Sequence, residues 1–357
     1  MSQRVSSLMR VLIPGLVAIC ASGASASIII DTVMVGNAGN AGEISGGPVG
    51  AGPSAIVGGV AYTYNMGKYE VTAWQYAAFL NAVAGVDTYA LYNTHMSDTA
   101  LGSGITRSGG GSVGNPYTYS VASAFVNRPV NYVGWGDSAR FANWMHNSQP
   151  TGSQGLATTE DGSYFLNGAT SNEALLTVTR NQNATWAIPT EDEWYKAAYY
   201  KSGSTNAGYW DFPTSSDAIP GRDMADVSGN NANYYNFSSG TYPIDSGKYT
   251  TVSGEFQNSA SPYGTFDQAG NLIEWNEAVI NSLRGYRGGS FASSYVISMH
   301  AITRNSNSPA MEDFAIGFRL AEVPEPASIA LLALASMGTR RGRRRRCSRG
   351  PDWRAGR

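Results

Sequence analysis

The stretch SPYGTFDQAGNLIEW, residues 261–275, combines a turn, several oxygen ligands and two large aromatic residues. Gly264 and Gly270 mark points where the backbone needs a positive φ angle or a close approach to a neighbour. Asp267 and Glu274 are hard carboxylate ligands, and carbonyl groups of the loop between them can complete the all-oxygen site that calcium prefers. The alternative is a polar turn between two strands with its tryptophan in the core, because the spacing is not that of an EF-hand.

The two ends of the 357-residue chain have the composition of targeting segments. Residues 1–26 predict a secretory signal peptide with arginines at its start, an apolar run over 11–21 and a small-residue cleavage site. At the other end, Val323-Pro324-Glu325-Pro326 precedes an apolar run at 327–338 and six arginines at 340–346. This run is too short to cross a bilayer comfortably, so it predicts a transient membrane anchor, with a C-terminal helix and basic tail as the alternative.

The C-terminal order of segments resembles the PEP-CTERM sorting signal of Gram-negative-type bacteria, which an exosortase reads. Residues 323–346 would form the signal and 347–357 a cytoplasmic remnant, which leaves 27–322 as the exported domain. The resemblance implies passage through the export machinery, transient insertion in the inner membrane and processing near 324–326 by an exosortase-type protease. The protein would then reside in the periplasm, on the outer surface or in the extracellular matrix.

The region between the two targeting segments is acidic and free of cysteine. Residues 27–326 contain 13 Lys and Arg against 25 Asp and Glu, a net charge near −12 compared with −2 for the full chain. This charge argues against nucleic acid as a partner. Cys20 and Cys347 both lie in the end segments, so the domain has no disulfide, no thiolate nucleophile and no thiolate metal ligand.

The pattern of helix and strand signals predicts a single α+β domain that is rich in loops. Capping boxes at Thr72 and Thr190 predict helices over 73–83 and 191–200, and an apolar pattern predicts a third over 136–146. Strands are predicted over 28–35, 60–70 and 316–320, with weaker ones around Tyr164 and Leu176. The intervening segments, 36–59 and 87–127 among them, are predicted as loops.

Six ordered segments resemble the sulfatase-modifying-factor family, whose founding member is the formylglycine-generating enzyme. They are GKYEVTAWQYAAFLNAV (67–83), RPVNYVGWGDSARFANWM (128–145), IPTEDEWYKAAYY (188–200), SPYGTFDQAGNLIEW (261–275), RGGSF (287–291) and IGFRLA (316–321). The resemblance spans roughly residues 32–321. It implies a fold related to C-type lectins, with little regular secondary structure.

The resemblance also implies a structural calcium site in the stretch at 261–275. Its ligands would be the Asp267 side chain, the Gly270 carbonyl, the Leu272 carbonyl and the Glu274 side chain. A second, weaker calcium site would fall on Asn233 and the Tyr234 carbonyl, where the family's carboxylate partner is missing from the sequence.

Enzymatic members of the family oxidise a substrate cysteine with copper held by two cysteines, and soft Cu(I) needs such thiolates. Those two positions correspond to Val296 and Ala301 here, and the tryptophan of the oxygen pocket corresponds to Ile273. We therefore expect no copper, no catalytic residues and no oxidase activity. An iron site is not expected either, because His95, His146 and His300 lack HxxxH or HExxH spacing.

These features predict a non-catalytic binding module for an envelope ligand, a glycan or a peptide, with its groove near residues 291–304. Arg304 and Arg319 either line that groove or pair with acidic neighbours. The alternative function is a formylglycine-generating-type or other metal-dependent oxidoreductase of altered chemistry. A purely structural matrix component is the third possibility.

Overall fold

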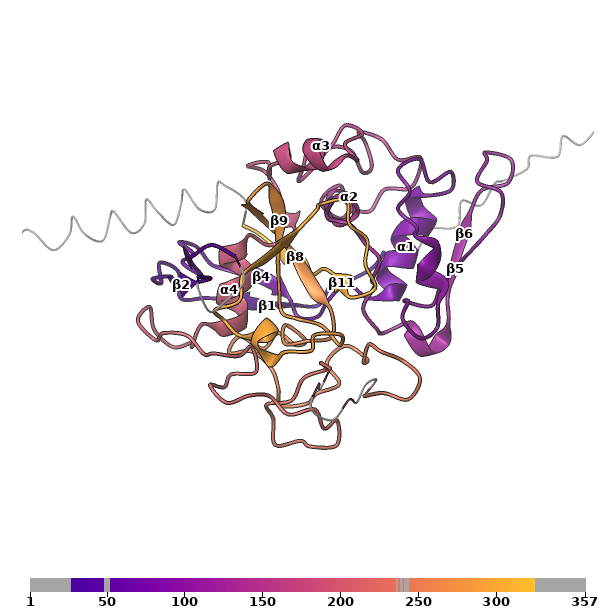
Figure 1. Ribbon diagram of the computed structural model, residues 1–357. Helices are drawn as coiled ribbons and strands as arrows, with labels where there is room; N and C mark the ends of the chain where they lie inside the picture. The colour runs from indigo at the N-terminus through magenta and orange to yellow at the C-terminus, as the bar shows by residue number, and fades with distance from the viewer. Residues whose placement is uncertain (1–26, 48–51, 236, 238–239, 241–243, 325–357) are drawn as a thin grey trace, which may run out of the picture.

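The computed structural model describes residues 27–47, 52–235, 237, 240 and 244–324 (Figure 1). The predicted signal peptide and everything beyond Pro324, with the apolar run, the arginines and both cysteines, lie outside the described residues. Within the described part of the chain, no helix is long and apolar enough to cross a membrane.

The first four-stranded sheet joins the two ends of the domain. Its strands are β1 (Thr32–Val35), β4 (Tyr64–Gly67), β7 (Trp186–Ala187) and β12 (Ala321–Glu322). They lie in the order β1-β4-β12-β7, and the neighbouring pairs are antiparallel. Strand β12, at the end of the described chain, is therefore an interior strand. Its Ala321 is opposite Met66 on one side and Ala187 on the other.

The second four-stranded sheet contains the end of the stretch that dominates the sequence. It has the order β10-β9-β8-β11, and its strands are β8 (Ile273–Ile280), β9 (Leu283–Arg287), β10 (Asn305–Asn307) and β11 (Ile316–Gly317). Strands β8 and β9 form a hairpin with an irregularity between Trp275 and Val279, while β11 pairs with β8 in parallel. Two hairpins stand outside these sheets, β2 (Glu43–Ser45) with β3 (Ala55–Val57) and β5 (Ile105–Ser108) with β6 (Thr118–Val121).

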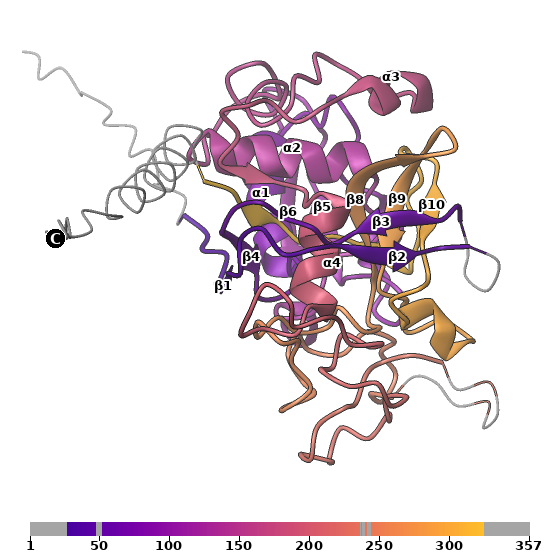
Figure 2. The ribbon, with the colours of Figure 1, turned by 90° about the vertical axis from the view of Figure 1, so that its left-hand side faces the viewer.

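In the described residues, four α-helices surround the sheets, namely α1 (Ala73–Val83), α2 (Trp135–His146), α3 (Asn172–Thr177) and α4 (Glu191–Tyr199). Short 3₁₀ helices occupy Thr94–Ser97, Ser123–Phe125 and Val296–Met299, the last labelled η3 below. Both predicted capping boxes are present, at Thr72 for α1 and at Thr190 for α4. Figures 1 and 2 show long loops between α4 and β8 filling one end of the molecule.

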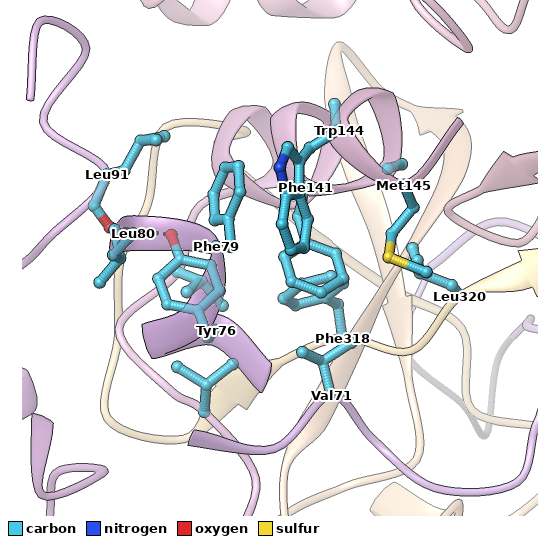
Figure 3. Packing of buried hydrophobic residues seen from close by; sticks show 14 of the residues in the cluster. Val71, Tyr76, Phe79, Leu80, Leu91, Phe141, Trp144, Met145, Phe318 and Leu320 are labelled. Atoms are coloured by element: carbon cyan, nitrogen blue, oxygen red, sulfur yellow. Dashed lines mark hydrogen bonds between the residues drawn. The ribbon is translucent and has the colours of Figure 1, made fainter. Parts of the chain in front are cut away.

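The main hydrophobic core lies between α1, α2 and the strand-like segment near Phe318 (Figure 3). Phe141 of α2 is at its centre, with ring centroids 5.3 Å from Phe79, 5.4 Å from Phe318 and 6.1 Å from Tyr76. These rings are all buried, and each stabilises the fold by roughly 2–3 kcal/mol through burial alone. The core thus fixes α2 against the rest of the domain.

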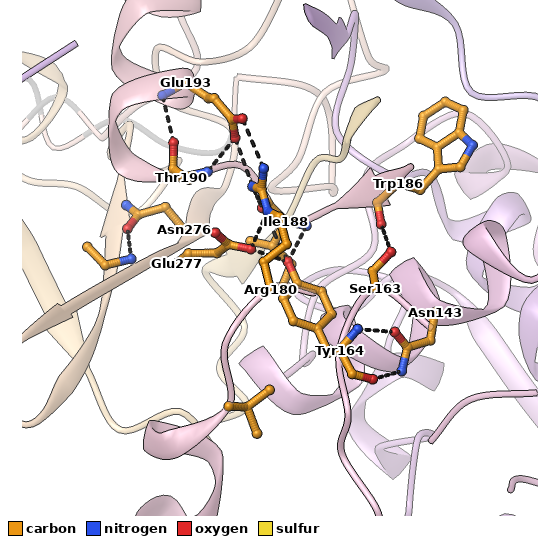
Figure 4. A network of polar contacts seen from close by, with 12 residues as sticks. Asn143, Ser163, Tyr164, Arg180, Trp186, Ile188, Thr190, Glu193, Asn276 and Glu277 are labelled. Atoms are coloured by element: carbon orange, nitrogen blue, oxygen red, sulfur yellow. Dashed lines mark hydrogen bonds and ion pairs between the residues drawn. The ribbon is translucent and has the colours of Figure 1, made fainter. Parts of the chain in front are cut away.

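A buried polar network ties α4 to β8 (Figure 4). Arg180 donates to both carboxylate oxygens of Glu193 at 2.8 and 2.9 Å, and its Nε donates to Glu277 Oε1 at 2.8 Å. Tyr164 also donates its hydroxyl to Glu277 Oε1. Glu193 is fully buried, so its charge is neutralised inside the protein rather than by solvent.

Several local predictions were wrong or incomplete. The predicted loops at 36–59 and 87–127 contain the two hairpins, because their short strands pair only with each other. Leu176 belongs to helix α3, capped by Ser171, rather than to a strand. The strands at 28–35 and 60–70 are shorter than predicted, and the closing segment is divided between β11 and β12.

Candidate functional site

The loop that precedes β8 has the unusual backbone that its glycines indicate. Gly264 has φ +91°, Gly270 +80°, and the non-glycine residues Asp267 and Asn271 also have positive values, +62° and +58°. A Cβ atom on Gly270 would lie 2.2 Å from the Asn233 carbonyl oxygen, so only glycine fits there. Both glycine predictions are confirmed.

Three of the four predicted calcium ligands present free oxygen atoms. Asp267 Oδ2 accepts a hydrogen bond from the Gly254 N–H at 2.6 Å, whereas its Oδ1 has no hydrogen-bond partner among the described residues. The Gly270 and Leu272 carbonyls, both on buried residues, accept no hydrogen bond from the described chain. Burial raises the pKa of Asp267 to about 6. Free carboxylate and carbonyl oxygens on one loop are the donor set that calcium prefers.

The fourth predicted ligand, Glu274, has protein partners on both carboxylate oxygens. Arg319 Nη2 donates to Oε1 at 2.6 Å, and Arg319 Nε and Trp194 Nε1 donate to Oε2 at 2.6 and 2.7 Å. Glu274 and Arg319 are both fully buried. Three of the four predicted ligands therefore fit a hard cation, while the charge of the fourth, Glu274, is already balanced by the Arg319 guanidinium. Calcium here stays a prediction.

Sequence reasoning missed a buried carboxylate that holds this loop in place. Glu70, which follows β4, accepts from the Leu272 N–H and from Asn271 Nδ2, each at 3.0 Å. Burial is the main cause that raises the pKa of Glu70 well above its usual range, and the negative charge of Asp267 is the second cause. The only signal in the sequence is a glutamate two residues before the Thr72 helix cap.

The predicted second cation site has a different cation beside it. Asn233 is buried, and its Nδ2 donates to the Tyr249 carbonyl at 2.8 Å and to Asn271 Oδ1 at 3.2 Å. The Tyr234 carbonyl accepts from Arg222 Nε at 2.5 Å. The guanidinium thus lies where the carbonyl would meet a metal ion, and like charges there repel. The second calcium site also stays a prediction.

The two positions that we expect to correspond to the family's copper ligands lie in separate apolar clusters. Val296, at the start of η3, is half-buried against a cluster that includes Phe212, Tyr234 and Met299. Ala301 is buried in another cluster with Val57, Trp194 and Tyr199. Ile273, the oxygen-pocket position, is half-buried against the main core. None of these three side chains carries a nitrogen, oxygen or sulfur atom that could ligate a metal.

The histidines do not assemble into a site. His95 stacks on Tyr132, with ring centroids 5.3 Å apart, and His146 Nδ1 lies 2.9 Å from Thr185 Oγ1. His300 packs edge-on against Phe212, and its Nε2 lies 3.7 Å from Asp211 Oδ1. In the part of the chain that the structure describes, no three His, Cys, Asp or Glu residues form a group that could hold a metal.

The arginines of the expected groove pair with acidic residues. Arg304 contacts both carboxylate oxygens of Glu191 at 2.8–2.9 Å, and Arg287 donates to Glu191 Oε1 at 2.7 and 3.0 Å. Glu191 is the first residue of α4, so the carboxylate at this helix N-terminus forms ion pairs with both arginines. Of the two alternatives for Arg304 and Arg319, pairing with acidic neighbours is the one observed.

A cavity of about 320 Å³, which no sequence pattern predicts, lies at the N-terminus of α2. Its lining comes from residues 88–90, the first turns of α2, the region of α3 and the loop before β11. Two carboxylates, Asp137 and Glu312, line it. Asp137 also caps the start of α2, because its Oδ2 accepts from the Gly134 N–H at 2.8 Å.

Comparison with known proteins places the domain and the C-terminal segment in recognised families. The model of the sulfatase-modifying factor enzyme 1-like domain matches residues 44–323, and that of the PEP-CTERM protein-sorting motif matches residues 322–346. The sorting motif implies export to the cell envelope of a Gram-negative-type bacterium and processing by exosortase-type machinery. No curated protein matches the chain.

Three solved structures are distantly similar. Treponema denticola variable protein 1 is 18% identical with a TM-score of 0.49, covering 82% of this chain and 95% of that one. CarF is 20% identical with a TM-score of 0.44, covering 83% and 99%, and PvdO from Pseudomonas aeruginosa is 20% identical with a TM-score of 0.43, covering 80% and 92%. The family match spans most of the chain and therefore establishes the family: this protein belongs to the sulfatase-modifying factor enzyme 1-like family.

Proposed function

We propose that this protein is an exported member of its family that has lost cysteine oxidation and acts as a binding module at the cell envelope or in the extracellular matrix. The observation that carries the proposal is the chemistry of Val296 and Ala301. Both are apolar, they pack in different clusters, and the sequence has no cysteine between Cys20 and Cys347. Copper-dependent oxidation needs thiolate ligands that this domain does not have.

A direct assay tests the loss of activity. The purified protein is incubated with copper, oxygen and a cysteine-containing sulfatase-type peptide, and mass spectrometry follows conversion of the thiol to the aldehyde. An active, cysteine-containing family member serves as the positive control. We expect no aldehyde and no stoichiometric copper. Copper-dependent aldehyde formation would overturn the proposal in favour of an oxidoreductase of altered chemistry.

The targeting segments give the proposed route. The signal peptide at 1–26 directs export, the apolar run at 327–338 anchors the chain transiently, and cleavage near 324–326 releases the domain. A glycan or a peptide of the envelope is the expected ligand, and a screen of both classes that finds only background binding would count against the binding role.

The proposal includes one structural calcium ion on Asp267, Gly270, Leu272 and Glu274. Its support is the set of free oxygens on Asp267, Gly270 and Leu272. Calcium added to chelator-treated protein should raise the free energy of unfolding by about 2.7 kcal/mol at a hundredfold excess over Kd. Asp267→Asn should weaken this effect. Asp223→Asn, an exposed acid that also accepts one main-chain hydrogen bond, is the matched control. Equal responses of both variants would contradict the site.

A further inference from the structure

The cavity at the N-terminus of α2 contains acceptors without donors. Asp137 is only 7% exposed; its Oδ2 is bonded to the Gly134 N–H, and its Oδ1 has no hydrogen-bond partner among the described residues. Glu312 is half-buried; its Oε2 accepts from Asn93 Nδ2 at 2.5 Å, and its Oε1 has no partner in the described chain. Two carboxylate oxygens at the wall of the cavity are thus open to a donor or a cation that enters from outside the protein.

No cation of the described protein neutralises this pair. Arg140 also lines the cavity, but its Nε and Nη2 donate to the two oxygens of Glu160 at 2.7 and 3.0 Å. The second donor of Nη2 reaches the Ala169 carbonyl, also at 3.0 Å. Neither Asp137 nor Glu312 forms an ion pair with a described residue. The cavity therefore has two acidic groups that form no ion pair with a described arginine or lysine and that can give up a proton to a basic ligand.

The surroundings argue against an anion. A helix N-terminus favours anions when its N–H groups are free. Here the Gly134 N–H donates to Asp137 and the Trp135 N–H donates to the Pro309 carbonyl at 2.8 Å, so two of the N–H groups at this helix start are already occupied. An anion would also face both carboxylates.

A calcium ion is disfavoured as well. Calcium takes six to eight oxygen ligands, whereas this cavity offers two carboxylates and no third acid, histidine or cysteine that could complete a metal group in the described chain. Much of the remaining wall is apolar and comes from Leu175, Pro309, Ala310 and the ring of Tyr89. Such a wall suits an alkyl or sugar carbon skeleton better than a hydrated ion.

We propose that this cavity binds a protonated primary amine, with Asp137 and Glu312 as the carboxylates that receive its N–H groups. The volume of about 320 Å³ is at the small end of ligand pockets, which fits an amino sugar or a single lysine side chain. Burial and the neighbouring Glu312 raise the pKa of Asp137 to about 8, so amine binding should release protons near neutral pH. Asp87 and Arg140 are the other charged groups that act on Asp137.

This inference gives a ligand class to the proposed binding role, and it is tested by a separate readout from the oxidase assay. Calorimetric titration of the full-length protein uses butylammonium, with the uncharged butanol as its matched control. We expect saturable binding of butylammonium alone. Asp137→Asn, which keeps an acceptor for the Gly134 N–H, and Glu312→Gln should each weaken it about tenfold or more, because hydrogen bonds to charged groups contribute about 1.5–3 kcal/mol.

Two further arms sharpen the test. Glu322→Gln, which changes an acid on β12 outside the cavity, should leave binding unchanged. Glucosamine and a lysine peptide, compared with glucose and an acetyl-lysine peptide, then separate the two sources of the amine. The proposal would be overturned by equal binding of butanol and butylammonium, by binding that does not saturate, or by unaltered binding in both cavity variants. It would also be overturned if calcium displaced butylammonium and the amines did not.

Discussion

Gly264 and Gly270 lie in the same loop and share a positive φ, but a side chain would meet different surroundings at each. At Gly264 the nearest atom to an added Cβ is Val33 Cγ1 at 3.8 Å, whereas at Gly270 it is the Asn233 carbonyl oxygen at 2.2 Å. Gly264→Ala should cost about 1 kcal/mol for the φ angle alone. Gly270→Ala should cost about 3 kcal/mol or more, because backbone must also move. Urea unfolding of the two variants compares them directly, and equal losses would show that the close approach is unimportant.

Asp137 makes stability depend on pH in a direction opposite to that of most acids. Its pKa rises from 3.8 to about 8 on folding, through burial and the nearby Glu312, so the folded state holds a proton that the unfolded chain releases. Stability from this group is complete below about pH 4 and is lost as the pH rises through about 8. The charged groups around it are Glu312, Asp87 and Arg140.

The corresponding variant is Asp137→Asn, which stays neutral throughout. Between about pH 5 and pH 9, the ligand-free wild type should lose more stability than this variant, as measured by urea midpoints. Glu312, whose pKa burial also raises, keeps part of the trend in the variant. Identical pH profiles for the two proteins would contradict the assignment.

Helices α1 and α4 begin with the same capping motif but depend on it differently. Gln75 of α1 is half-buried and accepts from the Thr72 N–H at 2.9 Å. Glu193 of α4 accepts from the Thr190 N–H at 2.7 Å and also neutralises Arg180 (Figure 4). Gln75→Ala should cost about 1 kcal/mol. Glu193→Ala should cost about 3–5 kcal/mol, because it leaves a buried guanidinium without its partner.

Unfolding free energies of both variants test this difference, with Thr72→Ala and Thr190→Ala as controls that remove only the caps. If Glu193→Ala were no worse than Thr190→Ala, the network with Arg180 would contribute little.

At this level the sequence predicts helices better than strands, and for a physical reason. The caps at Thr72 and Thr190 are local signals, so α1 and α4 begin where predicted. The two small hairpins and the split closing strand depend on pairing between distant segments, which no local pattern specifies. The same limit applies to the sites. Asp267 and Glu274 are visible in one motif, but Glu70 and Glu312 reach their positions only through the fold.

The whole domain depends on its last strand, and truncations test this. A chain that stops after Pro324 keeps β12 between β4 and β7, together with the hydrogen bond from the Val323 N–H to the Thr185 carbonyl at 2.8 Å. A chain that stops after Leu320 loses them. With each hydrogen bond contributing about 1 kcal/mol, the shorter chain should lose about 3–4 kcal/mol. Thermal melts compare the two, and similar melting temperatures would show that β12 is dispensable.

The interior position of β12 also has a consequence for biogenesis. Because strands near residues 32 and 322 share one sheet, the domain cannot complete its tertiary structure until its final residues have left the translocon. The family domain and the sorting motif overlap at residues 322–323, so the sorting motif emerges almost together with β12, the strand that completes the sheet. We therefore expect that maturation of the polypeptide finishes at the membrane surface, while it is still attached, and that release follows.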